Sequence, residues 1–327
     1  MADIGSPSPR RGTTRRTWLT RAVVLGAVGG GAWWARETLL WPTPDLRLGG
    51  NGGPSWTGFI DDRLIAPVIE ARINGRILRA LIDTGAQHSA IDRATLERIG
   101  GGSGSPAPML AFGMSGGPRL ARAATVMLEL ADVSVRDLRL AVLDLGPIAD
   151  EDGAGASVII GHDVLSQTVL ELDMTDDRLR LHPAGTRPDS SYRPLLTHRR
   201  DRAVEVTATV ESLSIRAILD TGSGSVLSLS ESTARAAGLL DGRPERRRSS
   251  LVLGGRTDAR LVRASSVRLG PLAFHNVEVA VFEGAGAPSA LVGAGALART
   301  RAWIDLAGGA TYLSADLPIE VMPARTG

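Results

Sequence analysis

The heptapeptide RALIDTG at residues 79–85 recurs as RAILDTG at residues 216–222. Five of the seven positions are identical, and the other two exchange one aliphatic side chain for another. Each copy is an apolar run that ends in Asp-Thr-Gly, at Asp83 and at Asp220. An aspartate at the end of an apolar strand is costly to bury alone, so each copy needs a partner for its carboxyl group.

Two further pairs of segments recur in the same order. VIIGHDVL at residues 158–165 parallels ALVGAGAL at 290–297, and LELDMTDDRLRL at 170–181 parallels AWIDLAGGATYL at 302–313. Three landmarks in one order indicate an internal duplication, because chance similarity of short peptides does not preserve a whole register. The chain of 327 residues is long enough for two such copies, each with its own core.

Each copy consists of short alternating segments that predict strands. The Asn-Gly pair at 74–75 predicts a tight hairpin turn. After each Asp-Thr-Gly we expect one short helix, with Asp92 or Ser230 as its N-cap and Gly100 or Gly238 at its end. The predicted class is all-β, with one short helix in each copy.

The composition limits the kinds of function. The 37 basic residues are all arginine, and 35 acidic residues are interleaved with them, so no basic surface for nucleic acid is expected. The chain has no cysteine, which excludes disulfides, a thiol nucleophile and cysteine-ligated zinc.

The amino-terminal region predicts export from the cytoplasm. Arg15 and Arg16 are followed after one spacer by Trp18 and Leu19, which resembles a twin-arginine export signal. The apolar run at 22–35 would be about 21 Å long as a helix, shorter than the bilayer core of about 30 Å. We therefore expect a periplasmic protein, or one anchored in the membrane and facing away from the cytoplasm.

These patterns predict an order of domains along the chain. It comprises an export signal or membrane anchor at 1–40, a flexible tether without regular structure at 41–58, an N-terminal lobe at 59–187, a linker at 188–200, a C-terminal lobe at 201–316 and a tail at 317–327.

The duplication suggests how the two acidic turns are used. If the copies pack about a pseudo-twofold axis, Asp83 and Asp220 meet there, and two neighbouring carboxyl groups share one proton. Such a pair is both a general acid and a general base, which suits attack of water on an amide carbonyl.

The residues that follow each aspartate are expected to support the turns. The hydroxyls of Thr84 and Thr221 can donate to the backbone of the other copy, and Gly85 and Gly222 allow close approach of the backbone. Ser223 is placed to hydrogen-bond the preceding aspartate, which would favour that aspartate as the ionised member of the pair.

The sequences DTGA at 83–86 and DTGS at 220–223 resemble the two active-site turns of aspartic proteases. The apolar-apolar-Gly segments at 159–161 and 291–293 resemble the strand that passes under each turn, and the lobe size resembles the retropepsin-like branch. The resemblance covers roughly residues 60–315. It implies a bilobal acid-protease fold in which two retropepsin-like β-barrel lobes, related by a pseudo-twofold axis, pair within one chain.

The same resemblance implies an aspartic endopeptidase with Asp83 and Asp220 as catalytic residues, an extended polypeptide as substrate, and no metal or cofactor. It also implies glycine-rich flap hairpins that contact the substrate. The candidate flap residues are Gly113, Met114, Ser115 and Gly116 in the first copy, and Gly254 and Gly255 in the second.

Three other interpretations remain open. Each Asp-Thr-Gly could be only a turn, or the chain could be a duplicated peptide-binding protein of the same fold without catalysis. A metal site could use His162, Asp163, Asp173 and His182, although their spacing fits no common zinc pattern.

Overall fold

The computed structural model describes residues 41–49, 53–60, 65–102, 104–111, 119–150, 155–200, 203–252, 255–282 and 288–314. The described residues from Pro44 onward form one compact unit. The expected export signal or anchor at 1–40 and the tail at 317–327 lie outside the described residues. Within the described part of the chain, no helix is long and apolar enough to cross a membrane.

The first lobe is a closed barrel of six strands. Their order around the barrel is β8 (Val133–Leu143), β5 (Ala90–Asp92), β9 (Val158–Ile160), β4 (Arg76–Ile82), β3 (Val68–Ile73) and β7 (Arg119–Leu130), and β7 pairs with β8 to close it. β1 (Asp45–Leu48) pairs with β8 and β6 (Ser105–Ala111) with β7. The helix α2 (Arg93–Arg98) follows β5.

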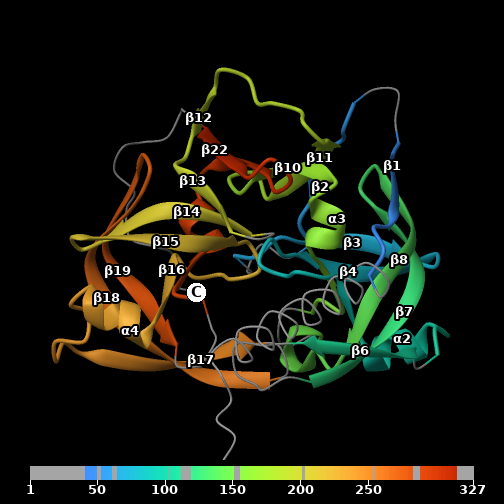
Figure 1. Cartoon of the computed structure of the whole chain (residues 1–327), viewed down its shortest axis with the longest axis horizontal. Helices are drawn as coiled ribbons and strands as arrows, with labels where there is room; N and C mark the ends of the chain where they lie inside the picture. The colour runs from blue at the N-terminus through green and yellow to red at the C-terminus, as the bar shows by residue number, and fades with distance from the viewer. Residues whose placement is uncertain are drawn as a thin grey trace, which may run out of the picture. The chain divides into compact units, whose positions relative to one another are not determined.

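The second lobe repeats this barrel strand for strand. The order is β19 (Leu272–Phe282), β16 (Leu227–Ser230), β20 (Ala290–Gly293), β15 (Leu213–Asp220), β14 (Ala203–Val210) and β18 (Gly255–Leu269), and β18 pairs again with β19. β13 (Thr197–Arg200) and β17 (Glu245–Val252) extend it, and α4 (Glu231–Ala236) follows β16. Figure 1 shows the first barrel in blue to green and the second in yellow to red. The predicted duplication and all-β class are confirmed.

A separate six-stranded sheet joins the lobes. Its order is β12 (Tyr192–Pro194), β22 (Ala310–Ser314), β21 (Arg301–Asp305), β10 (Thr168–Asp173), β11 (Arg178–Pro183) and β2 (Thr57–Gly58). In the central antiparallel pair, Glu171 lies opposite Trp303, between the pairs Leu170–Ile304 and Leu172–Ala302. The duplication makes 170 equivalent to 302 and 172 to 304, so these two flanking pairs exchange under a twofold rotation. The pseudo-twofold axis therefore passes between Glu171 and Trp303.

The segments expected to be a tether without regular structure and a linker both contribute strands. β1 and β2 lie in the expected tether at 41–58, and β12 and β13 lie in the expected linker at 188–200. β2 and β12 occupy equivalent places, as the two edge strands of the shared sheet. A strand of two or three residues has no room for an alternating pattern, and proline is tolerated at an edge, so these two edge strands carry no recognisable strand signal.

The predicted local signals are confirmed. The side chains of Asp92 and Ser230 accept hydrogen bonds from the backbone N–H three residues later, at 3.0 and 3.3 Å. Gly100 and Gly238 follow the helix ends with φ of +80° and +70°. The hairpin turn at 74–75 has positive φ at both residues, as an Asn-Gly turn requires.

Each lobe also has a second short helical turn that the sequence analysis did not predict. These are α3 (His162–Leu165) and the 3-10 helix η2 (Ala294–Leu297), at equivalent positions after β9 and β20. A further 3-10 turn, η1 (Gly146–Ile148), occurs in the first lobe. One-turn helices carry too few residues for a helical period to be visible in the sequence.

The apolar core runs without a break from one lobe to the other. Most of the buried Leu, Val and Ile side chains of both barrels belong to one cluster, which includes Leu170, Leu172, Ala302 and Ile304 of the shared sheet. The two lobes therefore share their hydrophobic stabilisation as well as a sheet.

A buried carboxylate lies at the centre of the shared sheet. Glu171 is 2% exposed and accepts hydrogen bonds from Arg180 Nε at 2.6 Å, His182 Nε2 at 2.7 Å and the Tyr192 hydroxyl at 2.6 Å. Burial raises the pKa of Glu171, but these donors outweigh it and lower the pKa to about 2. The ring of Trp303 lies over His182, with centroids 4.3 Å apart, and edge-on to Tyr192. Glu171 thus binds the strands β11 and β12 to β10.

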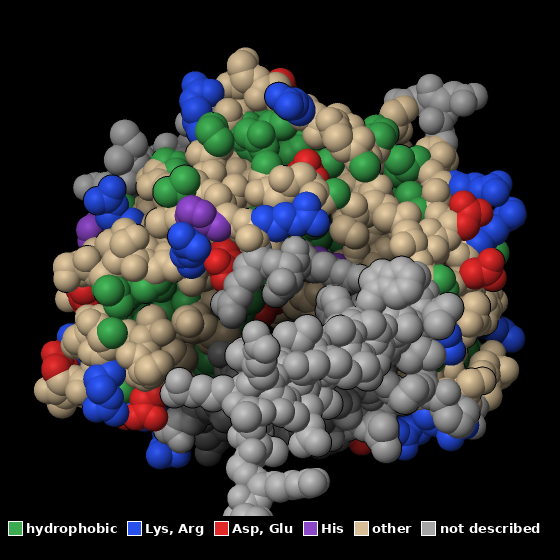
Figure 2. Space-filling view, in the orientation of Figure 1, with side chains coloured by type: hydrophobic (Ala, Val, Ile, Leu, Met, Phe, Trp, Pro, Cys, Tyr) green, Lys and Arg blue, Asp and Glu red, His purple; other side chains and the backbone are tan. Residues whose placement is uncertain are grey.

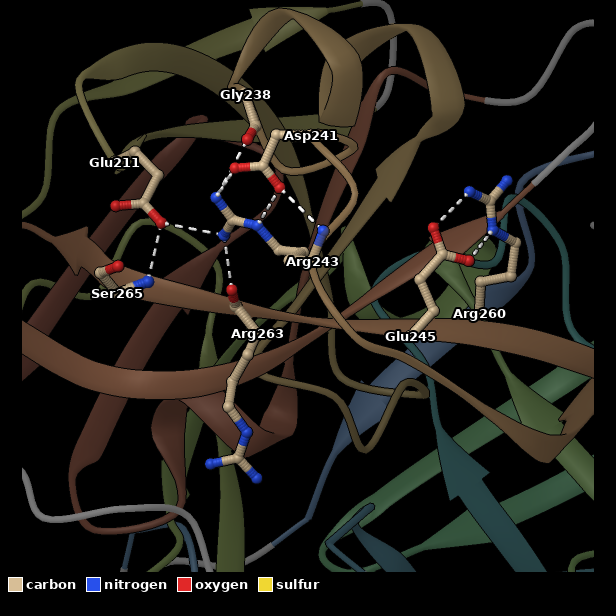
Figure 3. A network of polar contacts seen from close by, with 8 residues as sticks. All are labelled: Glu211, Gly238, Asp241, Arg243, Glu245, Arg260, Arg263 and Ser265. Carbon is tan, nitrogen blue, oxygen red and sulfur yellow. Dashed lines mark hydrogen bonds and ion pairs between the residues drawn. The ribbon is translucent and has the colours of Figure 1, made fainter.

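A second polar network fixes the start of the hairpin β17–β18 (Figure 3). The guanidinium of Arg243 bonds Asp241 at 2.9 Å and the carbonyl oxygens of Gly238 and Arg263 at 3.0 and 2.6 Å. Across the hairpin, Arg260 and Glu245 form two further bonds at 2.9 and 3.1 Å. Figure 2 shows basic and acidic side chains interspersed over the visible face.

Substitution of Glu171 by Gln should lower the free energy of unfolding by about 2 to 4 kcal/mol at pH 7, because Arg180 and His182 lose a charged acceptor in a buried site. Folding lowers the pKa of Glu171 from 4.5 to about 2. The contribution of its carboxylate to the free energy of unfolding is therefore fully present above pH 4.5 and is lost as the pH falls toward 2. Urea denaturation of wild type and variant between pH 2 and 7 measures this difference.

The exposed Glu70 is a matched control, and Glu70→Gln should change the unfolding free energy by less than about 0.5 kcal/mol. An effect of Glu171→Gln that stays constant down to pH 2 would contradict the role of the ionised carboxylate.

Candidate active site

The two Asp-Thr-Gly turns lie at equivalent strand ends. β4 ends at Ile82, directly before Asp83, and pairs in parallel with β9; β15 ends at Asp220 and pairs in parallel with β20. The Asp83 N–H donates to the Ile160 carbonyl at 3.0 Å. In each lobe, the neighbouring parallel strand, β9 or β20, thus sets the position of the acidic turn.

The threonines of the two turns hydrogen-bond across the seam between the lobes. Thr84 Oγ1 donates to the Leu219 carbonyl at 2.7 Å, and Thr221 Oγ1 donates to the Ile82 carbonyl at 2.6 Å. Each hydroxyl also accepts from the backbone N–H of the other threonine, at 3.0 and 3.1 Å. Both threonines are fully buried, so these four bonds have no competition from water.

The carboxyl groups of Asp83 and Asp220 meet and hydrogen-bond each other at this seam. A Cβ at Gly222 would lie 2.6 Å from Cγ of Asp83, and a Cβ at Gly85 would lie 2.8 Å from Cγ of Asp220. Each glycine therefore lies against the carboxyl group of the other lobe, where no side chain fits. Asp83 Oδ1 also accepts from the N–H groups of Gly85 and Ala86, at 2.8 and 3.1 Å.

The two aspartates are electrostatically unequal. Burial raises the pKa of Asp83 above its usual value, and hydrogen bonds from its own turn and from Asp220, together with the nearby His162, limit this rise. Burial also raises the pKa of Asp220 well above its usual range, and the charge of Asp83 raises it further. The pair therefore shares one proton, and the larger rise of the pKa at Asp220 favours that residue as its site.

The expectation for Ser223 is wrong in this respect. Its hydroxyl contacts the Ser225 hydroxyl at 2.8 Å, which in turn contacts that of Ser228 at 2.8 Å. Only the backbone N–H of Ser223 serves Asp220. The nearby serines offer an alternative partner, so the Ser223 hydroxyl does not keep Asp220 ionised.

The glycines of the supporting segments allow backbone to pass directly under each turn. A Cβ at Gly161 would lie 2.7 Å from the Ala86 carbonyl oxygen. A Cβ at Gly293 would clash with the carbonyl oxygens of Ser223 and Ser225. These contacts explain why an apolar pair is followed by glycine in both copies.

The first lobe has a polar support that sequence reasoning missed. Asp163 accepts hydrogen bonds from the N–H and hydroxyl of Ser89, at 2.9 and 2.5 Å, and the same hydroxyl accepts from the Gly161 N–H at 3.0 Å. Burial raises the pKa of Asp163 to about 6. The only signal in the sequence was the pair His162-Asp163, which stands where the second copy has Ala-Gly.

The residues considered for a metal site lie in separate networks. His162 contacts the Thr84 carbonyl and Asp163 contacts Ser89, whereas Asp173 bonds Arg178 and His182 bonds Glu171 in the shared sheet. In the described ranges, no group of three or more metal-ligating side chains comes together.

The candidate flap residues can be placed only in part. Gly113, Met114, Ser115, Gly116 and Gly254 lie outside the described residues. Gly255 is the first residue of β18. Its partner is Val252, and the corresponding pair in the first lobe is Ala111 with Arg119, so each candidate segment connects the two strands of a hairpin.

Replacement of Thr84 or Thr221 by Val should each lower the free energy of unfolding by about 2 to 4 kcal/mol, because a buried N–H and a buried carbonyl both lose their partner. The double variant should cost clearly less than the sum, since the two hydroxyls belong to one network. Chemical denaturation of the single and double variants gives these values. Replacement by Ser keeps the hydroxyl and should restore most of the loss, and Thr125→Val at an exposed position is the control. Additive losses would show that the two threonines act independently.

The stability of the wild type should fall with rising pH relative to Asp220→Asn. A carboxyl group whose pKa is raised by folding stabilises the protein below its unfolded pKa, and this contribution is lost as the pH rises through the folded pKa. Unfolding free energies measured from about pH 4 to pH 8 should therefore diverge in favour of the variant. Parallel curves for the two proteins would contradict the burial of a shared proton.

Known aspartic proteases match both lobes. A family model described as gag-polyprotein putative aspartyl protease matches residues 69–167, and one described as aspartyl protease matches residues 206–295. A retropepsin-like aspartic protease from Rickettsia conorii, known from a crystal structure, is 24% identical, over 37% of this chain and 89% of that chain, with a TM-score of 0.30. A search of curated proteins found no match. Because each lobe matches an aspartyl protease family model, and the two matches together cover more than half of the chain, the chain belongs to the aspartyl proteases as a two-lobed member.

Proposed function

We propose that the chain is an aspartic endopeptidase in which Asp83 and Asp220 together activate a water molecule for hydrolysis of peptide bonds. The observation that carries this proposal is the hydrogen bond between two buried carboxyl groups from different lobes. A turn that only needed to reverse the chain would not require its aspartate to lie against that of the other lobe. Burial of two carboxyl groups together is costly, and such sites are typical of acid–base catalysis.

The chemistry follows from the unequal protonation of the pair. Asp83, as the carboxylate, takes a proton from water while the water oxygen attacks the carbonyl carbon of the substrate. Asp220 donates its proton to the carbonyl oxygen, which gives a neutral tetrahedral diol. Collapse of the diol returns one hydroxyl proton to Asp220, and Asp83 passes its proton to the leaving amine. Both aspartates then regain their starting states, and no covalent bond to the enzyme forms.

The substrate in this proposal is an extended polypeptide that lies across the seam between the lobes, with its backbone paired to strand edges of the β-hairpins. Such binding gives affinity through main-chain hydrogen bonds and selection through side-chain pockets. The basic and apolar sequence of residues 1–40 supports export or anchoring of the enzyme. Its substrates are then exported or membrane proteins.

Asp83→Asn and Asp220→Asn should each reduce peptide cleavage at least about 100-fold, since each removes one partner of the acid–base pair. The test is incubation with a mixed peptide library, with products identified by mass spectrometry. Asp45→Asn, at an exposed position on β1, is the matched control and should cleave like the wild type. A statine-containing inhibitor, whose hydroxyl takes the place of the attacking water, should block cleavage.

Near-normal turnover by either active-site variant would contradict the shared-proton mechanism. Binding of peptides by the wild type without cleavage between pH 3 and 8 would instead support a duplicated, non-catalytic peptide-binding protein of the same fold.

A further inference from the structure

The two active-site turns are supported by equivalent backbone but by different side chains. The His162 N–H donates to the Ala86 carbonyl at 2.9 Å, and the Ala294 N–H donates to the Ser223 carbonyl at 2.7 Å. Both residues are buried, at 2% and 0% exposure. At this place, therefore, the first lobe presents an imidazole under its turn and the second lobe presents only a methyl group.

The imidazole is linked to Asp83 through a single peptide group. His162 Nε2 lies 2.7 Å from the Thr84 carbonyl oxygen, and a carbonyl oxygen can only accept, so Nε2 carries a proton. The nitrogen of the same peptide group is that of Gly85, which donates to Asp83 Oδ1 at 2.8 Å. A donor on the carbonyl side polarises the peptide and strengthens the bond that its N–H makes to the carboxylate.

We propose that His162 is a positioning residue that makes the two aspartates unequal, because it stabilises the ionised form of Asp83 through the peptide group between Thr84 and Gly85. The methyl group of Ala294 can donate nothing to the equivalent carbonyl of Thr221. The proton that the pair shares therefore resides on Asp220. This inference rests on the proposed function for its catalytic meaning, but not for the protonation state itself.

Other titratable groups surround the imidazole and enter the design of the test. Asp163 follows it in α3 and is bound by Ser89, and His88 belongs to the turn above Gly161. β10, which packs against α3, carries Glu171 and Asp173, each engaged by an arginine of β11. Asp83 is the carboxyl group that the imidazole reaches through the peptide group between Thr84 and Gly85.

The first experiment compares the pH dependence of kcat/KM in three variants. His162→Leu removes the donor, and should move the acidic limb of the profile upward by about one pH unit. Below that limb, kcat/KM should fall about tenfold relative to the wild type. His162→Gln retains a neutral donor and should recover part of the shift. The control is His275→Gln, at an exposed position of β19, which should leave the profile unchanged.

A general loss of activity with an unmoved acidic limb would assign His162 a purely structural role and overturn the proposal. An equal shift in Asp163→Asn would also overturn it, because the limb would then report the carboxyl group of Asp163. A shifted acidic limb in His162→Leu, together with a smaller shift in His162→Gln, supports the link through the peptide group.

The second experiment does not depend on activity. Carboxyl ¹³C NMR of aspartate-labelled protein follows the titration of the pair, with Asp83→Asn and Asp220→Asn used for assignment. The wild type should show the lower apparent pKa at Asp83, and His162→Gln and His162→Leu should raise it. Equal titration of the two aspartates in the wild type, or no change in folded His162→Leu, would refute the proposal. If the wild type cleaves no peptide, the proposed function fails, and this measurement still decides the role of His162.

Discussion

The exchange of hydrogen bonds between Thr84 and Thr221 is the constraint on which the rest of the structure depends. Each hydroxyl satisfies one N–H and one carbonyl of the opposite lobe in a site without water. This fixes the spacing of the two acidic turns, and hence brings together two carboxyl groups that would each avoid burial alone. The glycines then follow as a steric requirement, since each faces the carboxyl group of the other lobe.

The shared sheet maintains this arrangement at a second level. Its central strands continue the apolar core of both barrels, and its edge strands are the segments that lead into each lobe. The donors around Glu171 come from β11 and β12, and the ring of Trp303 packs against two of them, His182 and Tyr192. The seam is thus held by hydrogen bonds at the turns and by a buried ionic cluster in the sheet.

Much of the fold and of the candidate site could be predicted from the sequence, because the second copy of each motif supports the interpretation of the first. The repeated Asp-Thr-Gly and apolar-apolar-Gly segments predicted the two lobes and the meeting of Asp83 with Asp220, and residues typical of helix caps predicted the ends of the two helices. The contact of His162 with the Thr84 carbonyl could not be foreseen, because the two residues are 78 positions apart and come together only when the barrel closes. The hydroxyl of Ser223 illustrates another limit, because the sequence shows a donor but not which of several acceptors it chooses. The strands β2 and β12 were missed because so few residues cannot show a period.

The position of Glu171 opposite Trp303 has a consequence for how the protein is assembled. In a true homodimer, a residue on the twofold axis lies opposite the same residue of the other subunit. An acidic side chain there would therefore meet its own copy, and two like charges would be buried together. Fusion of the halves into one polypeptide removes that requirement and allows a charged residue to face an aromatic one. The halves have therefore become complementary rather than interchangeable, and two amino-terminal halves brought together would put glutamate against glutamate where this protein has an indole.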